Sequence, residues 1–185
     1  MHAVFTPRTL SERVRDFVAE RRAFPWFSLG LAPAFVENFE GAEVGNVVLL
    51  TYAFGVLPIA GPLQRTLPAT QHAIVEASPV PGLTGAGQIQ PRAQWHRVAS
   101  WLGFREVSFP EDGPFAKRFR VTSSSDHPRD IVHARVRQAM LATTETSLAW
   151  SQGRVMVRCP GPLAEAERKA FQEEAVALIA VSCAP

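Results

Sequence analysis

A turn rich in hydroxyl groups and cations is the part of this sequence whose residue types could bind a ligand. Three serines at 123–125 precede a histidine and an arginine, and Pro128 suits the first turn of a helix. The start of a helix attracts anions through its free N–H groups and its dipole. Positions 117–137 hold six cationic residues against two acidic ones, a local charge of +4. The residues predicted to bind an anion are Ser123, Ser124, Ser125, His127, Arg129, Arg118 and Arg120.

The anion expected there is a phosphate, a lipid headgroup or an acidic partner. The same turn also has an interpretation that needs no ligand. A side-chain oxygen of Asp126 or Ser125 would accept a hydrogen bond from the first turn of the helix and cap it. Asp126 would also repel an anion. The sequence therefore favours the cap over the anion site.

Other patterns of catalysis or metal binding do not occur in the sequence. The glycine-rich stretch from Gly82 to Gly87 lacks the Lys-Ser/Thr pair of a phosphate loop and the spacing of a dinucleotide fingerprint. There is no Gly-x-Ser-x-Gly elbow. Ser125, Asp126 and His127 are consecutive, whereas a catalytic triad needs groups that converge in space. The histidines show no i, i+4 pair, so we expect no metal, no cofactor and no catalytic residue.

The two cysteines, Cys159 and Cys183, are too few for a disulfide framework in a chain of this length. Neither belongs to a Cys-x-x-Cys pair. We expect two free thiols in a reducing cytoplasm. A bridge between them is the alternative for an exported protein.

Composition indicates one globular domain over residues 1–185. The chain is 46% hydrophobic and 19% charged, which is too apolar for global disorder. A net charge of +2 does not indicate nucleic-acid binding. The first residues lack the pattern of a signal peptide. The most apolar run, 175–184, is about half as long as a membrane-spanning helix, so we expect a cytoplasmic protein without a transmembrane segment.

Periodicity predicts a helix over 7–22, within an N-terminal helix and extended arm at 1–28. The run VVLLTYAF at 47–54 predicts a strand, and a second strand is centred on 72–75. Residues 79–90 are expected to form a loop or a bent strand. One or two helical turns are expected at 95–102, and a short strand at 106–109.

The C-terminal third has the clearest pattern. Alternation predicts a half-buried strand at 115–122, followed by a helix from Pro128 to about Leu141. Two strands, 148–150 and 154–158, flank a turn at Gly153, which can supply a positive φ. A last helix is expected from about Leu163 to Val181.

This order of elements predicts an α+β fold with an α+β core at 30–182. The expected architecture is a mostly antiparallel sheet packed against an N-terminal helix, a central helix and a C-terminal helix. We see no internal repeat and no linker.

The residues Phe115, Phe119, Val121, Ser123 and Asp126 form a Phe-x3-Phe-x-Val-x-Ser strand followed by an acidic turn. This pattern resembles an uncharacterised family of bacterial proteins that is common in actinobacteria. The strand before Tyr52 also resembles an earlier strand of that family, and the resemblance spans roughly 30–180. It implies a domain of unknown function with no catalytic residues to transfer. Many members have transmembrane segments before the domain, and no such segment is expected here.

Three functions are compatible with the sequence. The leading expectation is a non-enzymatic binding or scaffolding domain that recognises a protein partner, a second copy of itself or an anionic group through the basic turn. The first alternative is a carrier of a small apolar ligand, with a pocket between the sheet and the C-terminal helix. The second is an enzyme whose active site is assembled from dispersed residues.

Overall fold

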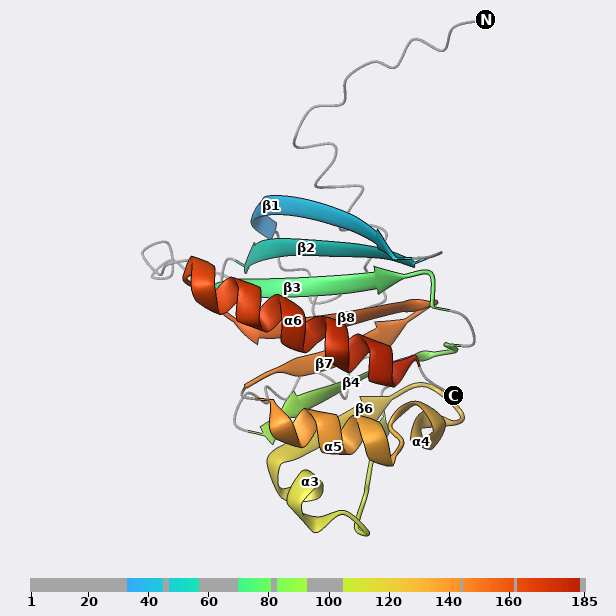
Figure 1. Ribbon diagram of the computed structural model, residues 1–185. Helices are drawn as coiled ribbons and strands as arrows, with labels where there is room; N and C mark the ends of the chain where they lie inside the picture. The colour runs from blue at the N-terminus through green and yellow to red at the C-terminus, as the bar shows by residue number, and fades with distance from the viewer. Residues whose placement is uncertain are drawn as a thin grey trace, which may run out of the picture.

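The structure is a computed structural model, and it describes residues 33–44, 47–56, 70–80, 83–92, 105–143, 145–161 and 163–183. Within these ranges the chain forms an antiparallel sheet of eight strands with four helices (Figure 1). The strands are β1 (Pro33–Val44), β2 (Val47–Val56), β3 (Thr70–Ser78), β4 (Ala86–Pro91), β5 (Arg105–Val107), β6 (Phe119–Ser123), β7 (Ser147–Ser151) and β8 (Arg154–Pro160). The helices are α3 (Gly113–Arg118), α4 (Pro128–Ile131), α5 (Ala134–Ala142) and α6 (Glu165–Ser182).

The strands follow the order β1-β2-β3-β8-β7-β4-β6-β5, and every neighbouring pair is antiparallel. The last hairpin, β7 with β8, therefore lies in the middle of the sheet, between β4 and β3. This arrangement confirms the α+β class and the antiparallel sheet. The predicted helix at 7–22, the arm at 1–28 and the turns at 95–102 lie outside the described residues.

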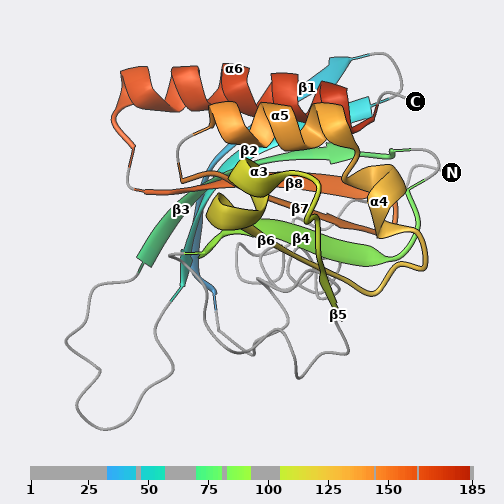
Figure 2. The same cartoon turned by 90° about the horizontal axis from the view of Figure 1, so that it is seen from below.

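Helices α3, α5 and α6 lie on one face of the sheet (Figure 2). The register explains why, because one row of directly opposed residues across five strands is entirely aliphatic. Its members are Val121, Ile89, Leu148, Val157 and Val75. All five side chains are buried in one core, and burial of each contributes roughly 1.5–3 kcal/mol.

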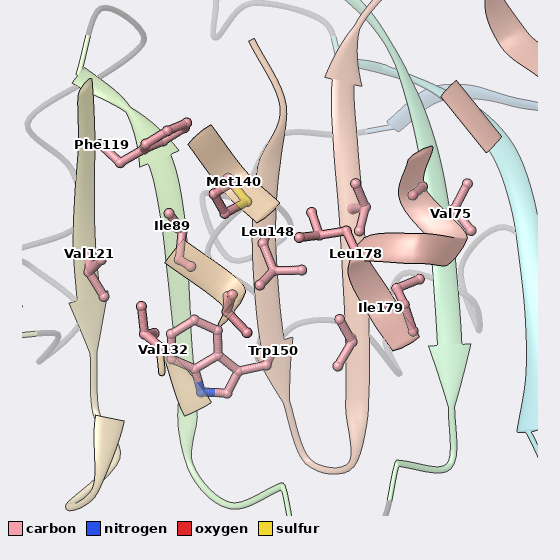
Figure 3. Close-up of a cluster of buried hydrophobic side chains, with 14 of the residues drawn as sticks. Val75, Ile89, Phe119, Val121, Val132, Met140, Leu148, Trp150, Leu178 and Ile179 are labelled. Carbon is pink, nitrogen blue, oxygen red and sulfur yellow. The ribbon is translucent and has the colours of Figure 1, made fainter. Parts of the chain in front are cut away.

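The core between the sheet and the helices is filled with side chains. Leu178 of α6 points toward Leu148, and Ile179 lies on the side of Val75, as Figure 3 shows. Helix α6 packs against β3 and β8, and α5 packs against α6 and α3. Closer to β4, the ring of Trp150 lies so near Gly87 that a Cβ at position 87 would collide with it. The packing of Trp150 therefore requires a glycine at position 87.

The predicted hairpin and C-terminal helix are confirmed. Gln152 and Gly153 join β7 to β8 with φ of 48° and 72°. Two consecutive positive φ angles are typical of the tight turn whose twist matches that of the strands. The carbonyl of Gly153 also accepts a hydrogen bond of 2.6 Å from the N–H of Val80, which ties the turn to the end of β3.

The predicted strand at 115–122 is wrong in its first half. Residues 113–118 form helix α3, and the strand β6 begins only at Phe119. Asp112 starts the helix, because its carboxylate accepts a hydrogen bond of 3.3 Å from the N–H of Phe115. Phe115 and Phe119 are four residues apart, which is a helical spacing, and their rings stack at 5.4 Å.

The predicted helix from Pro128 to about Leu141 is also interrupted. Val132 (φ −96°, ψ 49°) ends α4, and His133 (φ −69°, ψ 172°) is extended before α5 begins. Arg137 stabilises the break, since its guanidinium donates a hydrogen bond of 2.9 Å to the carbonyl of Val132. The pattern of apolar residues continues across the break, so periodicity alone did not reveal it.

Candidate functional site

The serine turn is held to the sheet by its own hydroxyl groups. Ser123 and Ser124 both donate to the carbonyl of Ala86 in β4, at 3.1 and 3.2 Å. Ser123 Oγ accepts from the N–H of Ser125 at 2.9 Å, and Ser125 Oγ accepts from the N–H of His127 at 3.3 Å. These bonds fasten the segment after β6 to its neighbouring strand.

The predicted cap of the following helix is wrong. The N-cap residue of α4 is His127, and it makes no side-chain capping bond. Ser125 instead bonds to the residue before the helix. Helix α4 has only four residues, so few aligned peptide groups contribute to its dipole.

The arginines of the predicted site lie on different elements and hold different partners. Arg118 donates to the carbonyls of Leu141, at 2.7 Å, and of Thr143, and so caps the C-terminal end of α5. Arg120 forms an ion pair of 2.5 Å with Glu106 in the adjacent strand β5.

Arg129 binds the segment before α3. Its guanidinium contacts Glu111 at 3.0 Å and the carbonyl of Ser108 at 2.7 Å, and it lies over the ring of Phe109. The structure thus brings the serines and His127 together but does not gather the three arginines around them. Anion binding at this turn stays a prediction.

A second cluster of polar residues lies on the opposite face of the sheet from the helices, and we call it the polar face. Six of its side chains are buried, with exposed fractions between 0% and 7%. They are Glu76, Gln88, Gln90, Thr122, Ser147 and Ser151. Three arginines, at 120, 154 and 158, occupy the same face by strand alternation. A sheet face that is both polar and buried is unusual, because the polar face of an antiparallel sheet ordinarily meets water.

The register places these residues in rows. In one row, Glu106 of β5 lies opposite Thr122, Thr122 opposite Gln88, and Gln88 opposite Ala149. In the neighbouring row, Arg120 lies opposite Gln90. Farther along the same side, Ser147 lies opposite Arg158. Glutamate thus lies in the first row, and arginine in the second.

Strand β7 contributes only small side chains to this face. Ser147, Ala149 and Ser151 alternate with Leu148 and Trp150, which enter the core on the other side. Longer side chains flank them, glutamines on β4 and Arg154, Met156 and Arg158 on β8. All three side chains of this small column are buried.

Three buried oxygen atoms of the polar face have no hydrogen-bond partner among the described residues. They are Oε1 of Gln88, Oγ1 of Thr122 and Oγ of Ser147. Native proteins satisfy most buried polar groups, and an orphaned one costs about 1–3 kcal/mol. On the helix side of the sheet, two ring nitrogens are also buried without a hydrogen-bond partner: Nε1 of Trp150 and Nε2 of His133. Among the described residues, such atoms occur on directly opposed residues of adjacent strands only on the polar face, at Gln88 and Thr122.

Two charged groups of the polar face are strongly desolvated. Glu76 is fully buried and accepts a hydrogen bond of 2.7 Å from Arg154. Burial lowers the pKa of Arg158 to about 10, although the neighbouring Cys159 thiolate would raise it. Arg158 remains charged at neutral pH.

The sequence analysis did not identify the polar face. Alternation along 154–158 puts Arg154 and Arg158 on the face opposite to Val155 and Val157, as the register shows. However, alternation alone predicts that such arginines point to water. The signal that could have been used is the column Ser147, Ala149, Ser151, which is unusually small for the outer face of a strand.

The described part of the chain contains neither a metal-binding cluster nor a membrane-spanning helix. No group of three or more His, Cys, Asp or Glu residues there is placed to hold a metal ion. None of the helices described is both long and apolar enough to cross a membrane. Both cysteines are free thiols.

Comparison of the chain with protein-family models, with curated proteins and with solved structures gives no match. The resemblance to the uncharacterised bacterial family therefore stays a prediction.

Proposed function

We propose that this protein is a non-enzymatic binding domain, and that it binds a small polar molecule on the polar face of its sheet. The observation that carries this proposal is the set of buried, unpartnered oxygens of Gln88, Thr122 and Ser147 on three strands that the register brings together. A ligand that bonds to these atoms would remove their desolvation cost.

The position of the set favours a ligand over a structural network. A structural network in a core satisfies its own members, because a partly satisfied one is less stable than an apolar core. Glu76 and Arg154 form such a bonded pair at one side of the face. Next to them, the three oxygens lack protein partners within the described ranges. A face of this kind is suited to an incoming hydrogen-bonding molecule.

The alternative of an apolar ligand beneath the C-terminal helix has less support. The layer between α6 and the sheet is occupied by Val75, Val157, Ala175, Leu178 and Ile179, all buried in one cluster. Recognition of a protein partner or a second copy of the chain, anion binding at the serine turn and a cytoplasmic location all stay predictions.

The test is a thermal-shift screen of small polar molecules: sugars, polyols, amino acids, organic acids and nucleosides. The proteins compared are the unaltered chain, a Thr122→Val/Ser147→Ala variant, and a Thr84→Val control whose residue is exposed. We expect at least one class to raise the Tm of the unaltered chain and of the control, but not that of the double variant. Binding at 100 times Kd would stabilise the protein by about 2.7 kcal/mol.

A class of compounds that stabilises the double variant as strongly as the unaltered chain would place binding elsewhere. If no class stabilises any of the three proteins, the proposal is wrong.

A further inference from the structure

We propose that the outer edge of strand β1 binds an extended segment of another protein, rich in lysine or arginine, which adds a further strand to the sheet. β1 is the border strand of the described sheet, and its only described neighbour is β2 (Figure 1). This surface is separate from the polar face, so the inference does not depend on the proposed function.

The two borders of the sheet differ in length. β1 has 12 residues, whereas β5 at the opposite border has 3. A border strand presents a row of backbone N–H and C=O groups that its own sheet leaves unbonded, and proteins commonly limit such a row with a very short strand, with lysine or with proline. β5 is short. β1 contains no lysine, and its single proline, Pro33, is its first residue, so β1 keeps a long row for pairing within the described sheet.

The charges of β1 specify the kind of partner. The strand carries Glu37, Glu40 and Glu43 and no cationic residue, and β2 beside it carries no charge. Opposite charges on neighbouring strands stabilise a sheet, and like charges destabilise it. A second copy of β1 would bring acids against acids, and the phosphates of a nucleic acid would be repelled as well. A strand of another protein with cationic residues is the complement of this edge.

The register of β1 indicates how the cations should be spaced. Glu37 and Glu40 are opposite Ala53 and Thr51 of β2, and a register shift lies between the two pairs. Ala53 and Thr51 are two residues apart, so the shift places both glutamates on one face of the sheet, although they are three residues apart in sequence. Thr51 is opposite Val75, which belongs to the core on the helix side. A partner strand with cations at alternate positions would match both glutamates.

This mode of binding divides the work between backbone and side chains. An extended segment at a sheet edge gains affinity from main-chain hydrogen bonds and specificity from its alternate side chains. Removing the N–H groups of the segment should therefore abolish binding, and reversing the charge should weaken it. These two effects are separable, because each can be introduced into the partner without altering the protein.

The experiment is an NMR titration with three synthetic peptides of about eight residues, an ordinary strand length. One alternates lysine and valine, the second alternates glutamate and valine, and the third is the lysine peptide with proline at every valine position. We expect the lysine peptide to bind about ten-fold or more tightly than the glutamate peptide. Cross-peaks from β1 should shift, and the outward N–H groups of β1 should exchange more slowly with solvent. The proline peptide should not bind.

A charge-reversed variant, Glu37→Lys/Glu40→Lys, should exchange the preference and bind the glutamate peptide more tightly. The matched control is Glu165→Lys/Glu173→Lys, which makes the same change of charge at two exposed positions of α6 and should keep the original preference. The dispersion of the NMR spectrum reports whether each variant is folded. If the charge-reversed variant is not folded, the three peptides on the unaltered chain still provide the test.

The inference is wrong if the lysine peptide does not bind, or if the lysine and glutamate peptides bind equally. Equal binding of the lysine and proline peptides would show attraction of charge without strand addition and would also overturn it. Protection of the β1 amides that rises with protein concentration, without any peptide, would mean that a second copy of the chain occupies the edge. None of these outcomes bears on ligand binding at the polar face, which the thermal-shift screen tests separately.

Discussion

Gln88 lies directly opposite Thr122 across strands β4 and β6, and each keeps a buried side-chain oxygen without a hydrogen-bond partner among the described residues. The two residues face away from the helices, in the row between Glu106 and Ala149. Residues that contribute only to folding would be satisfied or apolar here. This pair is therefore the clearest sign that the sheet has a role beyond supporting the core.

The contact between Gly87 and Trp150 predicts an intolerance to the smallest side chain. In Gly87→Ala the new methyl group would collide with the indole ring, and we expect a loss of roughly 1–3 kcal/mol in the free energy of unfolding. Urea denaturation followed by tryptophan fluorescence measures it.

Gly113→Ala is the matched control, because nothing lies within 4 Å of a Cβ at that position. It begins helix α3, so alanine should be neutral or slightly stabilising there. Equal effects of the two substitutions would refute the packing account of Gly87.

Arg118 is predicted to act through the end of α5 rather than through an anion. Its guanidinium bonds to the carbonyls of Leu141 and Thr143, which no residue of the helix can satisfy. Arg118→Ala should therefore destabilise the protein by about 1 kcal/mol. Lys117→Ala, its exposed neighbour in α3, should change stability little. Chemical denaturation of both variants in phosphate-free buffer separates this role from anion binding, since a purely ligand-binding arginine would leave the stability unchanged.

The two cysteines should differ in their response to salt. Burial raises the pKa of Cys159, and Glu174, Glu145 and Glu167 raise it further, while Arg158 lowers it by a smaller amount. Burial alone raises the pKa of Cys183. Only the thiolate reacts with iodoacetamide. Both cysteines should therefore react more slowly at pH 8 than an exposed cysteine of ordinary pKa. Added salt screens the glutamates and should accelerate the reaction of Cys159 but not of Cys183.

Peptide mass spectrometry after timed alkylation measures the two rates separately, and identical salt dependence would contradict this assignment.

The same shifts in the pKa values of the two thiols make the stability of the protein depend on pH. The folded-state pKa of each thiol exceeds its ordinary value of 9.0. The contribution of the protonated thiol to the free energy of unfolding is therefore complete below pH 9.0. It is lost as the pH rises through the folded-state value.

Much of the fold could be predicted from local patterns. The two strands predicted at 148–150 and 154–158, on either side of the turn at Gly153, identified the β7–β8 hairpin. Strand order could not be predicted, because the position of β4 between β7 and β6 depends on contacts distant in sequence. The strand predicted over Phe115 failed because Asp112 and Pro114 start a helix that alternation does not reveal.

The candidate site was harder to predict than the fold. Sequence reasoning selected the serine turn because its cations are close in sequence, yet Arg118 and Arg129 bind separate parts of the structure. The polar face is assembled from residues as far apart as Glu76 and Arg154. Each of its members is ordinary by itself, and only the register of the strands makes them neighbours.

The free energy of unfolding of Thr122→Val, measured by urea denaturation without ligand and compared with the unaltered chain and Thr84→Val, tests the central claim most directly. Valine has nearly the shape of threonine but lacks the hydroxyl that has no described partner. If the polar face is maintained for a ligand, the substitution should leave stability unchanged or raise it by about 1 kcal/mol. A loss of about 1 kcal/mol or more would mean that the hydroxyl already serves the fold, and would contradict the account.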